Sequence, residues 1–234
     1  MIIVLSLIAL LLAIVFVAVR VSRGGPIALY FKAVASLAFC AFGLYGAYKS
    51  GLNIISVFML LGLILGMLGD IVLDLKVMYK QQEELHLNAG MLSFGVGHLM
   101  YFMALTAYLN SSSLLVQSKL VSMLLIAFAI GLLLTTLIMT FAEPLLKLKF
   151  GKFTYQTALY TFALTFMTAY AFTASIFVNK LLILAVGLLL FLLSDLVLSN
   201  QYFGGKQDNK VLTTINHILY CLGQILIALT IFFI

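Results

Sequence analysis

Two aspartates occupy similar places in the chain, each near the end of a long apolar run. Asp70 lies in the phrase LGDIVL, and Asp195 lies in the closely related phrase LSDLVL. Beyond a basic segment, each phrase is followed by a His-x-x-Tyr pair, His98 with Tyr101 in the first case and His217 with Tyr220 in the second. Carboxyl, imidazole and phenol groups are common proton donors and acceptors in catalysis. Because an ionisable side chain inside a bilayer is costly, we interpret the recurrence as a functional site.

A pair of aspartates in one pocket can act as an acid and a base. One carboxyl group can deliver a proton to a substrate, while the other stays ionised and stabilises a cation or positions water. Nucleophilic chemistry is less well supported, since the chain lacks Gly-x-Ser-x-Gly. Ser194 adjoins Asp195, but consecutive residues of a helix do not face each other. A zinc site is disfavoured because His-x-x-x-His is absent, and we expect no metal ion.

The composition defines the environment of these residues. Hydrophobic residues make up 65% of the 234 residues, charged residues make up 9%, and the mean hydropathy is +1.23. This balance indicates an integral membrane protein. The formal net charge of +6 comes from basic residues between apolar runs, which suits loops facing an anionic membrane surface rather than nucleic acid. Cys40 and Cys221 lie in apolar runs without a CxxC motif, so we expect no disulfide framework.

Eight apolar runs are long enough to span a bilayer as helices. They fall at about 1–19, 27–48, 53–75, 89–109, 114–141, 154–178, 180–199 and 211–233. The runs are continuously apolar rather than alternating, which favours helices over a barrel. No stretch is long enough for a separate soluble domain, so residues 1–234 are predicted to form a single all-α, polytopic membrane domain.

The basic residues predict the orientation of the helices. Loops after the odd helices carry nine of them, Arg20, Arg23, Lys76, Lys80, Lys147, Lys149, Lys152, Lys206 and Lys210. Loops after the even helices carry three, Lys49, Lys119 and Lys180. The excess places the odd loops in the cytoplasm and both termini outside, in a bacterial cytoplasmic membrane. The third and seventh helices then run in the same direction, which indicates two parallel repeats of four helices unless the similarity of the phrases is coincidental.

The ionisable residues within the runs concentrate at one end. With a rise of 1.5 Å per residue, Lys32, Asp70 and His217 lie about 8–9 Å from the predicted cytoplasmic interface, and His98 lies about 13 Å from it. This one-sided arrangement favours a cavity open to the cytoplasmic side over a continuous channel. Asp74 is expected to be solvated beside the interface. We place Glu83, Glu84 and His86 in a wetted loop.

Each of these residues also has a purely structural interpretation. The aspartates can hydrogen-bond to neighbouring helices, Lys32 can extend its ammonium group to the headgroups, and the two histidines can bridge helices. The residues alone support an intramembrane acid–base enzyme or a proton-coupled transporter that uses Asp70 and Asp195 as relays. A non-catalytic lipid-binding or scaffold protein is a third reading.

Several phrases resemble the lysoplasmalogenase-like membrane family, known in bacteria as YhhN proteins. The resemblance is carried by Gly69-Asp70 with Leu73, GVGHLMY from Gly95 to Tyr101, Tyr160, Gly187-x-x-x-Phe191-x-x-Ser194-Asp195-x-x-Leu198 with Phe203, and Tyr220 with Gln224. The order and spacing of the eight helices also agree, so the resemblance covers almost the whole chain.

The resemblance implies hydrolysis of the vinyl ether bond of a lysoplasmalogen, which releases a fatty aldehyde and a glycerophospho-base such as glycerophosphoethanolamine or glycerophosphocholine. Asp70 and Asp195 would be catalytic, with one protonating carbon and the other stabilising the oxocarbenium ion, as paired carboxyls do in glycosidases. Substrate binding is assigned to Lys32, His98, Tyr101, Tyr160, Ser194, His217 and Tyr220. The expected partners are a lysophospholipid substrate and membrane lipids, and no cofactor is required.

Overall fold

The computed structural model describes residues 1–111, 117–205 and 209–234. These residues form eight long helices and no strand. The helices are α1 (Ile2–Ser22), α2 (Gly25–Lys49), α3 (Ile54–Asp74), α4 (Glu83–Ser111), α5 (Gln117–Leu146), α6 (Thr154–Phe177), α7 (Leu182–Tyr202) and α8 (Lys210–Thr230). All eight are long and apolar enough to cross a membrane, as the sequence predicts. Residues 114–116 of the predicted fifth helix lie outside the described residues.

The helix ends follow local sequence signals. The side chain of Asn53 accepts a hydrogen bond from the backbone N–H of Ser56 and caps α3, and Asn209 caps α8 in the same way. The turn from α1 to α2 contains Gly24 and Gly25, both at positive φ, and Pro26 follows in the first turn of α2. This short connection makes α1 and α2 antiparallel neighbours, so the end of α1 lies close to the start of α2.

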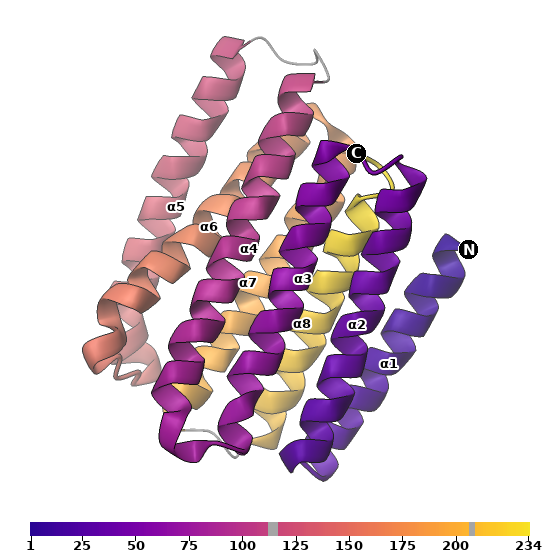
Figure 1. Ribbon diagram of the computed structural model, residues 1–234. Helices are drawn as coiled ribbons and strands as arrows, with labels where there is room; N and C mark the ends of the chain where they lie inside the picture. The colour runs from indigo at the N-terminus through magenta and orange to yellow at the C-terminus, as the bar shows by residue number, and fades with distance from the viewer. Residues whose placement is uncertain (112–116, 206–208) are drawn as a thin grey trace.

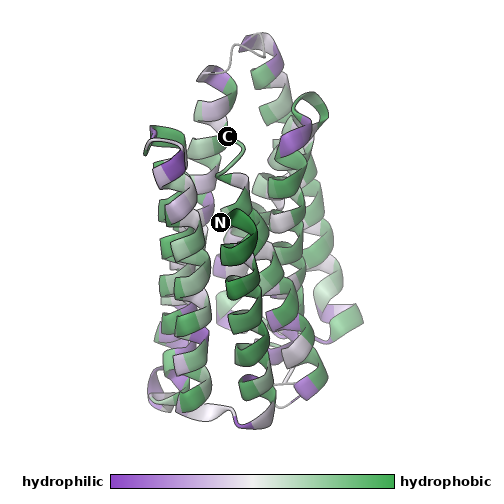
Figure 2. Ribbon diagram, turned by 90° about the vertical axis from the view of Figure 1, so that its right-hand side faces the viewer, coloured by the Kyte–Doolittle hydropathy of each residue, from purple (hydrophilic) through white to green (hydrophobic). Residues whose placement is uncertain are grey.

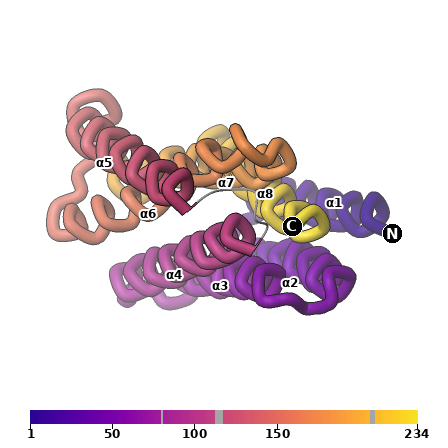
Figure 3. The backbone as a smooth tube through the Cα atoms, turned by 90° about the horizontal axis from the view of Figure 1, so that it is seen from above, coloured from indigo at the N-terminus to yellow at the C-terminus, as the bar shows by residue number. Residues whose placement is uncertain are grey.

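Six helices form a closed ring in which each packs against the next, in the order α2, α3, α4, α6, α7 and α8, with α8 returning to α2. The view along the bundle in Figure 3 shows the row of α2, α3 and α4 facing a row that contains α7 and α8. Outside the ring, α1 packs against α2 and α8, while α5 packs against α6. Each half of the chain therefore contributes one outer helix and three ring helices, an arrangement that fits the proposed repeat.

The two ends of the bundle differ in their connections. The helices α1, α3, α5 and α7 end toward the bottom of Figure 1, whereas the C-terminus lies near the top. We call this lower end the odd-loop end. Hydrophobic residues dominate the long middle part of the helices, and hydrophilic residues gather toward the ends (Figure 2). The cytoplasmic location of the odd-loop end stays a prediction from the distribution of basic residues.

The fourth helix begins earlier than the sequence predicted. Glu83, Glu84 and His86 belong to the first turns of α4, so their assignment to a loop is wrong. Two acidic residues in the first turn favour this longer helix, because they lie at the positive end of the helix dipole. His86 is buried, and the two glutamates form ion pairs with Lys76 and Lys152.

Close contact between α7 and α8 depends on two glycines, Gly187 and Gly223. A Cβ atom on Gly223 would lie 2.8 Å from the carbonyl oxygen of Gly187, which is a backbone atom that cannot turn away. We therefore expect Gly223→Ala to lower the free energy of unfolding by about 1–3 kcal/mol, measured as a reduced thermal midpoint in detergent. The matched control is Gly95→Ala, whose Cβ would meet nothing closer than 4.0 Å. Equal midpoints for both variants would contradict this packing.

Candidate functional site

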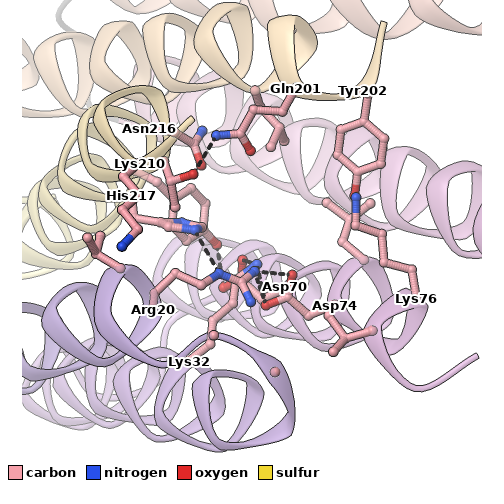
Figure 4. A pocket seen from close by; sticks show the side chains of 18 of the residues that line it. Arg20, Lys32, Asp70, Asp74, Lys76, Gln201, Tyr202, Lys210, Asn216 and His217 are labelled. Atoms are coloured by element: carbon pink, nitrogen blue, oxygen red, sulfur yellow. Dashed lines mark hydrogen bonds and ion pairs between the residues drawn. The ribbon is translucent and has the colours of Figure 1, made fainter. Parts of the chain in front are cut away.

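A polar cavity of about 700 Å³ opens at the odd-loop end, between α1, α2, α3, α7 and α8. Figure 4 shows its polar side chains pointing toward one another from helices that are far apart in the sequence. Its charged lining comprises five basic residues, Arg20, Arg23, Lys32, Lys76 and Lys210, and four acidic residues, Asp70, Asp74, Asp195 and Glu83. The cavity therefore collects both predicted catalytic aspartates at one end of the bundle.

Asp70 of α3 is held by side chains from two other helices, α2 and α8, at the inner part of the cavity. Its Oδ2 atom accepts hydrogen bonds from the hydroxyl groups of Ser36 in α2, at 2.6 Å, and Tyr220 in α8, at 2.7 Å. Lys32 places its ammonium nitrogen 3.2 Å from Oδ1. The side chain of Gln224 donates to the hydroxyl oxygen of Tyr220 at 3.1 Å and thereby orients that phenol. Asp70 is 1% exposed, so these contacts replace its hydration.

Asp74 lies one turn after Asp70 and takes part in a second ion pair. The Nη2 atom of Arg20 donates to both carboxylate oxygens of Asp74, at 2.6 and 2.7 Å, while its Nε atom donates to Nε2 of His217 at 3.3 Å. Lys32 also approaches Asp74, at 3.6 Å. Asp74 is 4% exposed, so the expectation that it is solvated is wrong. Arg20 from α1 closes over this carboxylate and removes it from water.

The surroundings of Asp195 are different. The phenol of Tyr160 in α6 donates a short hydrogen bond to Oδ2, and the hydroxyl of Ser194 lies 3.4 Å from Oδ1. Among the side chains that the structure describes, no lysine or arginine lies within ion-pair distance of this carboxyl group. The two aspartates thus share a cavity, but only Asp70 has a cationic partner.

A second, apolar cavity of about 290 Å³ adjoins the polar one between α4, α5, α6 and α7. Residues that line both cavities are Leu73, Phe94, Asp195, Leu198 and Tyr202. Tyr160 lines the apolar side, together with Ala142, Leu164 and other aliphatic residues. Asp195 therefore lies where a polar and an apolar compartment meet, which is the geometry expected around the junction of a lipid headgroup and its chain.

The structure brings some predicted binding residues to these cavities and places others elsewhere. Lys32, His217 and Tyr220 line the polar cavity, and Tyr160 and Ser194 contact Asp195. The described contacts of the Lys32 ammonium group are with the carboxylates of Asp70 and Asp74, and its assignment to substrate binding stays a prediction.

His98 and Tyr101 line neither of these two cavities. The Nδ1 atom of His98 lies 2.9 Å from the carbonyl oxygen of Phe94, and its ring packs against Phe191. Tyr101 packs against Gly62. Among the described residues, neither Nε2 of His98 nor the hydroxyl of Tyr101 has a hydrogen-bond partner. The second His-x-x-Tyr pair therefore reaches the polar cavity. Of the first pair, His98 lines a separate, mostly apolar cavity of about 570 Å³ between α4 and α6, which Tyr160 also lines, while Tyr101 packs within the helix bundle.

Several residues of the site were missed by the sequence analysis. Ser36 donates to Asp70, and Asn216 donates to the backbone of Ser194 at 2.7 Å. Gln224 carries part of the family resemblance, but its role in orienting Tyr220 was not predicted. The spacing of four residues between Asp70 and Asp74 could have predicted that Asp74 faces the same cavity, because residues four apart share a helix face. Arg20 had no comparable signal, since a basic residue at the end of an apolar run is most simply counted as part of a loop.

Fold and cavities together define a multi-pass helical membrane protein in which the buried Asp70 and Asp74 line a polar cavity and the partly buried Asp195 lies where that cavity meets an apolar one. The model of the YhhN family matches residues 27–231. The chain belongs to the YhhN family. No curated protein and no solved structure matches it significantly. The matched region begins in α2, so α1 and Arg20 lie outside it.

Proposed function

We propose that this protein is a membrane-embedded lysoplasmalogenase that hydrolyses the vinyl ether bond of a single-chain ether phospholipid. The observation that carries the proposal is the position of Asp195, which lines both the polar cavity with Asp70 and the apolar cavity between α4 and α7. In an alkenyl lysophospholipid, the vinyl ether group joins the hydrocarbon chain to the polar headgroup. A substrate with its headgroup in the polar cavity and its chain in the apolar cavity therefore presents this group to Asp195.

The different surroundings of the two aspartates suggest different roles. No cation among the described side chains lies within ion-pair distance of Asp195, which suits a carboxylic acid that carries a proton. Asp70 is paired with Lys32, which suits a carboxylate. Tyr160 and Ser194 would hold the Asp195 carboxyl group in position through their contacts with its oxygens. The assignment makes Asp195 the proton donor and Asp70 the stabilising base.

The reaction then follows the chemistry of vinyl ethers. Asp195 transfers its proton to the alkenyl carbon that is not bonded to oxygen, which leaves an oxocarbenium ion on the carbon that is. The Asp70 carboxylate stabilises this cation and directs water to it. Addition of water, with loss of a proton to a carboxylate, gives a hemiacetal. Cleavage of its ether carbon–oxygen bond releases the fatty aldehyde and returns the glycerol hydroxyl of the glycerophospho-base.

The direct test is aldehyde release from a lysoplasmalogen by the purified protein in detergent. Stoichiometric release of aldehyde and glycerophospho-base, with multiple turnovers and without any ion gradient, would support the hydrolase. Absence of release from folded protein, combined with substrate uptake into sealed vesicles, would instead favour the proton-coupled transporter. A saturated alkyl ether with the same headgroup is the control substrate, because it has no double bond to protonate.

The apolar cavity leads to a prediction about chain length. Ala142 in α5 is buried and lines this cavity, so Ala142→Phe would fill part of it. We expect kcat/KM for a long-chain alkenyl substrate to fall by about tenfold or more. A short-chain substrate serves as the internal control, because it leaves the far part of the cavity empty and should lose little. An equal loss for both chain lengths, or no loss, would contradict the assignment of the chain to this cavity.

A further inference from the structure

We infer that Arg20 of α1 forms a phosphate subsite in the polar cavity, where it would bind the phosphodiester of an amphiphilic substrate. This inference rests on the proposed function and deepens it, because it assigns the anionic part of the ligand to one side chain. It also gives a role to a helix that precedes the residues matched by the family. The ligand chemistry is a singly charged phosphate ester, which a lipid headgroup or a free phosphate compound can supply.

The first step in the argument is the hydrogen bonding of the guanidinium group. Nη2 of Arg20 donates to Asp74, and Nε donates to His217. Nη1 makes no hydrogen bond with any described residue, so its two N–H groups remain available. Arg20 lines the cavity with its side chain 14% exposed, so part of this side chain is accessible from the cavity interior. Asp74 and His217 hold the planar group in place before a ligand arrives.

The second step is comparison with the other cations of the cavity. Lys32 is 5% exposed and shared between Asp70 and Asp74. Lys76 lies 3.6 Å from the ring centroid of Tyr202 and pairs with Glu83. Arg23 and Lys210 are exposed at the rim. Arg20 thus differs from Lys32, whose ammonium group lies deeper and contacts two carboxylates, because a whole guanidinium nitrogen of Arg20 is left without a described partner at the cavity wall (Figure 4).

The third step is the charge balance of the lining. The five basic residues exceed the four acidic ones by one. In the proposed mechanism Asp195 carries a proton, which increases the positive excess further. A phosphodiester group placed beside Arg20 would offset this excess locally. A planar guanidinium group suits the task because it binds phosphate oxygens through charge-assisted hydrogen bonds while keeping its bonds to Asp74.

The test measures binding rather than turnover. Two ligands with the same saturated alkyl ether chain are compared on the purified full chain in neutral detergent: an alkyl lysophosphoethanolamine and the alkylglycerol that lacks the phosphoethanolamine group. Dissociation constants come from the ligand dependence of the thermal midpoint. For the wild type, we expect the phosphate to increase affinity by about 10- to 100-fold, the range for a hydrogen bond to a charged group.

Arg20→Gln should remove the phosphate-dependent gain in affinity for the phospholipid and leave the affinity for the alkylglycerol unchanged. Arg20→Lys should restore only part of it, because one ammonium group cannot bind Asp74 and the phosphate with the same geometry. Since Arg20→Gln leaves Asp74 with fewer partners and can impair folding, Arg20→Gln/Asp74→Asn is measured in parallel and should show the same loss. Lys152→Gln, which removes an exposed charge at the same end outside the cavity, should bind both ligands like the wild type.

Two results would overturn the inference. The first is a phosphate-dependent gain that persists in the double variant, and the second is equal weakening of both ligands by Arg20→Gln. Inorganic phosphate that displaces the phospholipid at matching affinity would identify a free-anion site and overturn the assignment to a headgroup. The saturated ligands have no vinyl ether, so this binding test does not depend on hydrolysis. If binding depends on Arg20 but no aldehyde is released from a lysoplasmalogen, the proposed hydrolysis is rejected and the phosphate subsite is retained.

Discussion

Replacing Asp195 by asparagine is expected to lower kcat for aldehyde release by at least about 10²-fold, the usual contribution of a general acid. Asparagine has nearly the same shape and can still accept the hydrogen bond from Tyr160. It cannot deliver a proton to carbon. Proton transfer occurs in the transition state and contributes neither to substrate binding nor to folding. The KM and the thermal midpoint should therefore change little. Steady-state kinetics on the purified variant, with its thermal midpoint as a folding check, provides the measurement.

The comparison with Asp70→Asn separates the roles of the two aspartates. Asp70 has a cationic partner and two hydroxyl donors, so its replacement should reduce both turnover and stability. Glu84→Gln is the control carboxyl, because Glu84 is exposed and pairs with Lys152 outside the cavity. If Asp195→Asn keeps wild-type turnover while Asp70→Asn abolishes it, the acid is Asp70 and the proposed assignment is reversed. If both retain turnover, the aspartates do not carry the chemistry.

The eight helices could be predicted because their signal is local and strong. Each apolar run is long enough to span a bilayer, and in lipid a single continuous run has few alternatives to a helix. The ends were harder to place, as Glu83 and Glu84 illustrate. These acidic residues looked like part of a polar loop, although in the first turn of α4 they are favourable. Length and hydropathy therefore determined the number of helices, but local capping and charge determined where they begin.

The rotation of each helix about its axis could not be predicted. In a soluble helix an apolar stripe indicates the buried face, but these helices are apolar on nearly all sides. Two similar His-x-x-Tyr pairs could not be distinguished for this reason. His217 and Tyr220 face the polar cavity from α8, whereas Tyr101 in α4 packs against Gly62. For the same reason, the sequence could not predict that α1 and α5 lie outside the ring.

The aspartates could be recognised from the sequence because an ionisable side chain in an apolar membrane helix is costly and therefore rare. The residues that contact them could not be predicted. Arg20 contacts Asp74 across 54 positions of the sequence, and Tyr220 contacts Asp70 across 150. Such pairs depend on how α1 and α8 pack around the ring. Arg20 was counted with the loop cations, and only the position of α1 beside α2 and α8 shows that it enters the cavity.

Replacing Lys32 by methionine is expected to destabilise the protein and to reduce turnover together. Its ammonium nitrogen lies 3.2 Å from Asp70 and 3.6 Å from Asp74, and the residue is 5% exposed. Removing one partner of a buried ion pair typically costs about 3–5 kcal/mol, because the remaining charge is left without compensation. Without its counter-ion, Asp70 would no longer offer a stable carboxylate to the oxocarbenium ion. The measurements are the thermal midpoint in detergent and kcat for aldehyde release.

The double variant Lys32→Met/Asp70→Asn separates these two effects. Removing both partners leaves no isolated charge at Asp70, so the thermal midpoint should recover part of the loss, while turnover should stay low because the carboxylate is gone. Lys49→Met is the matched control, since Lys49 lies at the opposite end of the same helix and is exposed. If Lys32→Met is as stable and as active as that control, the ammonium group reaches the headgroups instead of neutralising Asp70. The assignment of Asp70 as the carboxylate and Asp195 as the acid depends on this ion pair, and it would then be rejected.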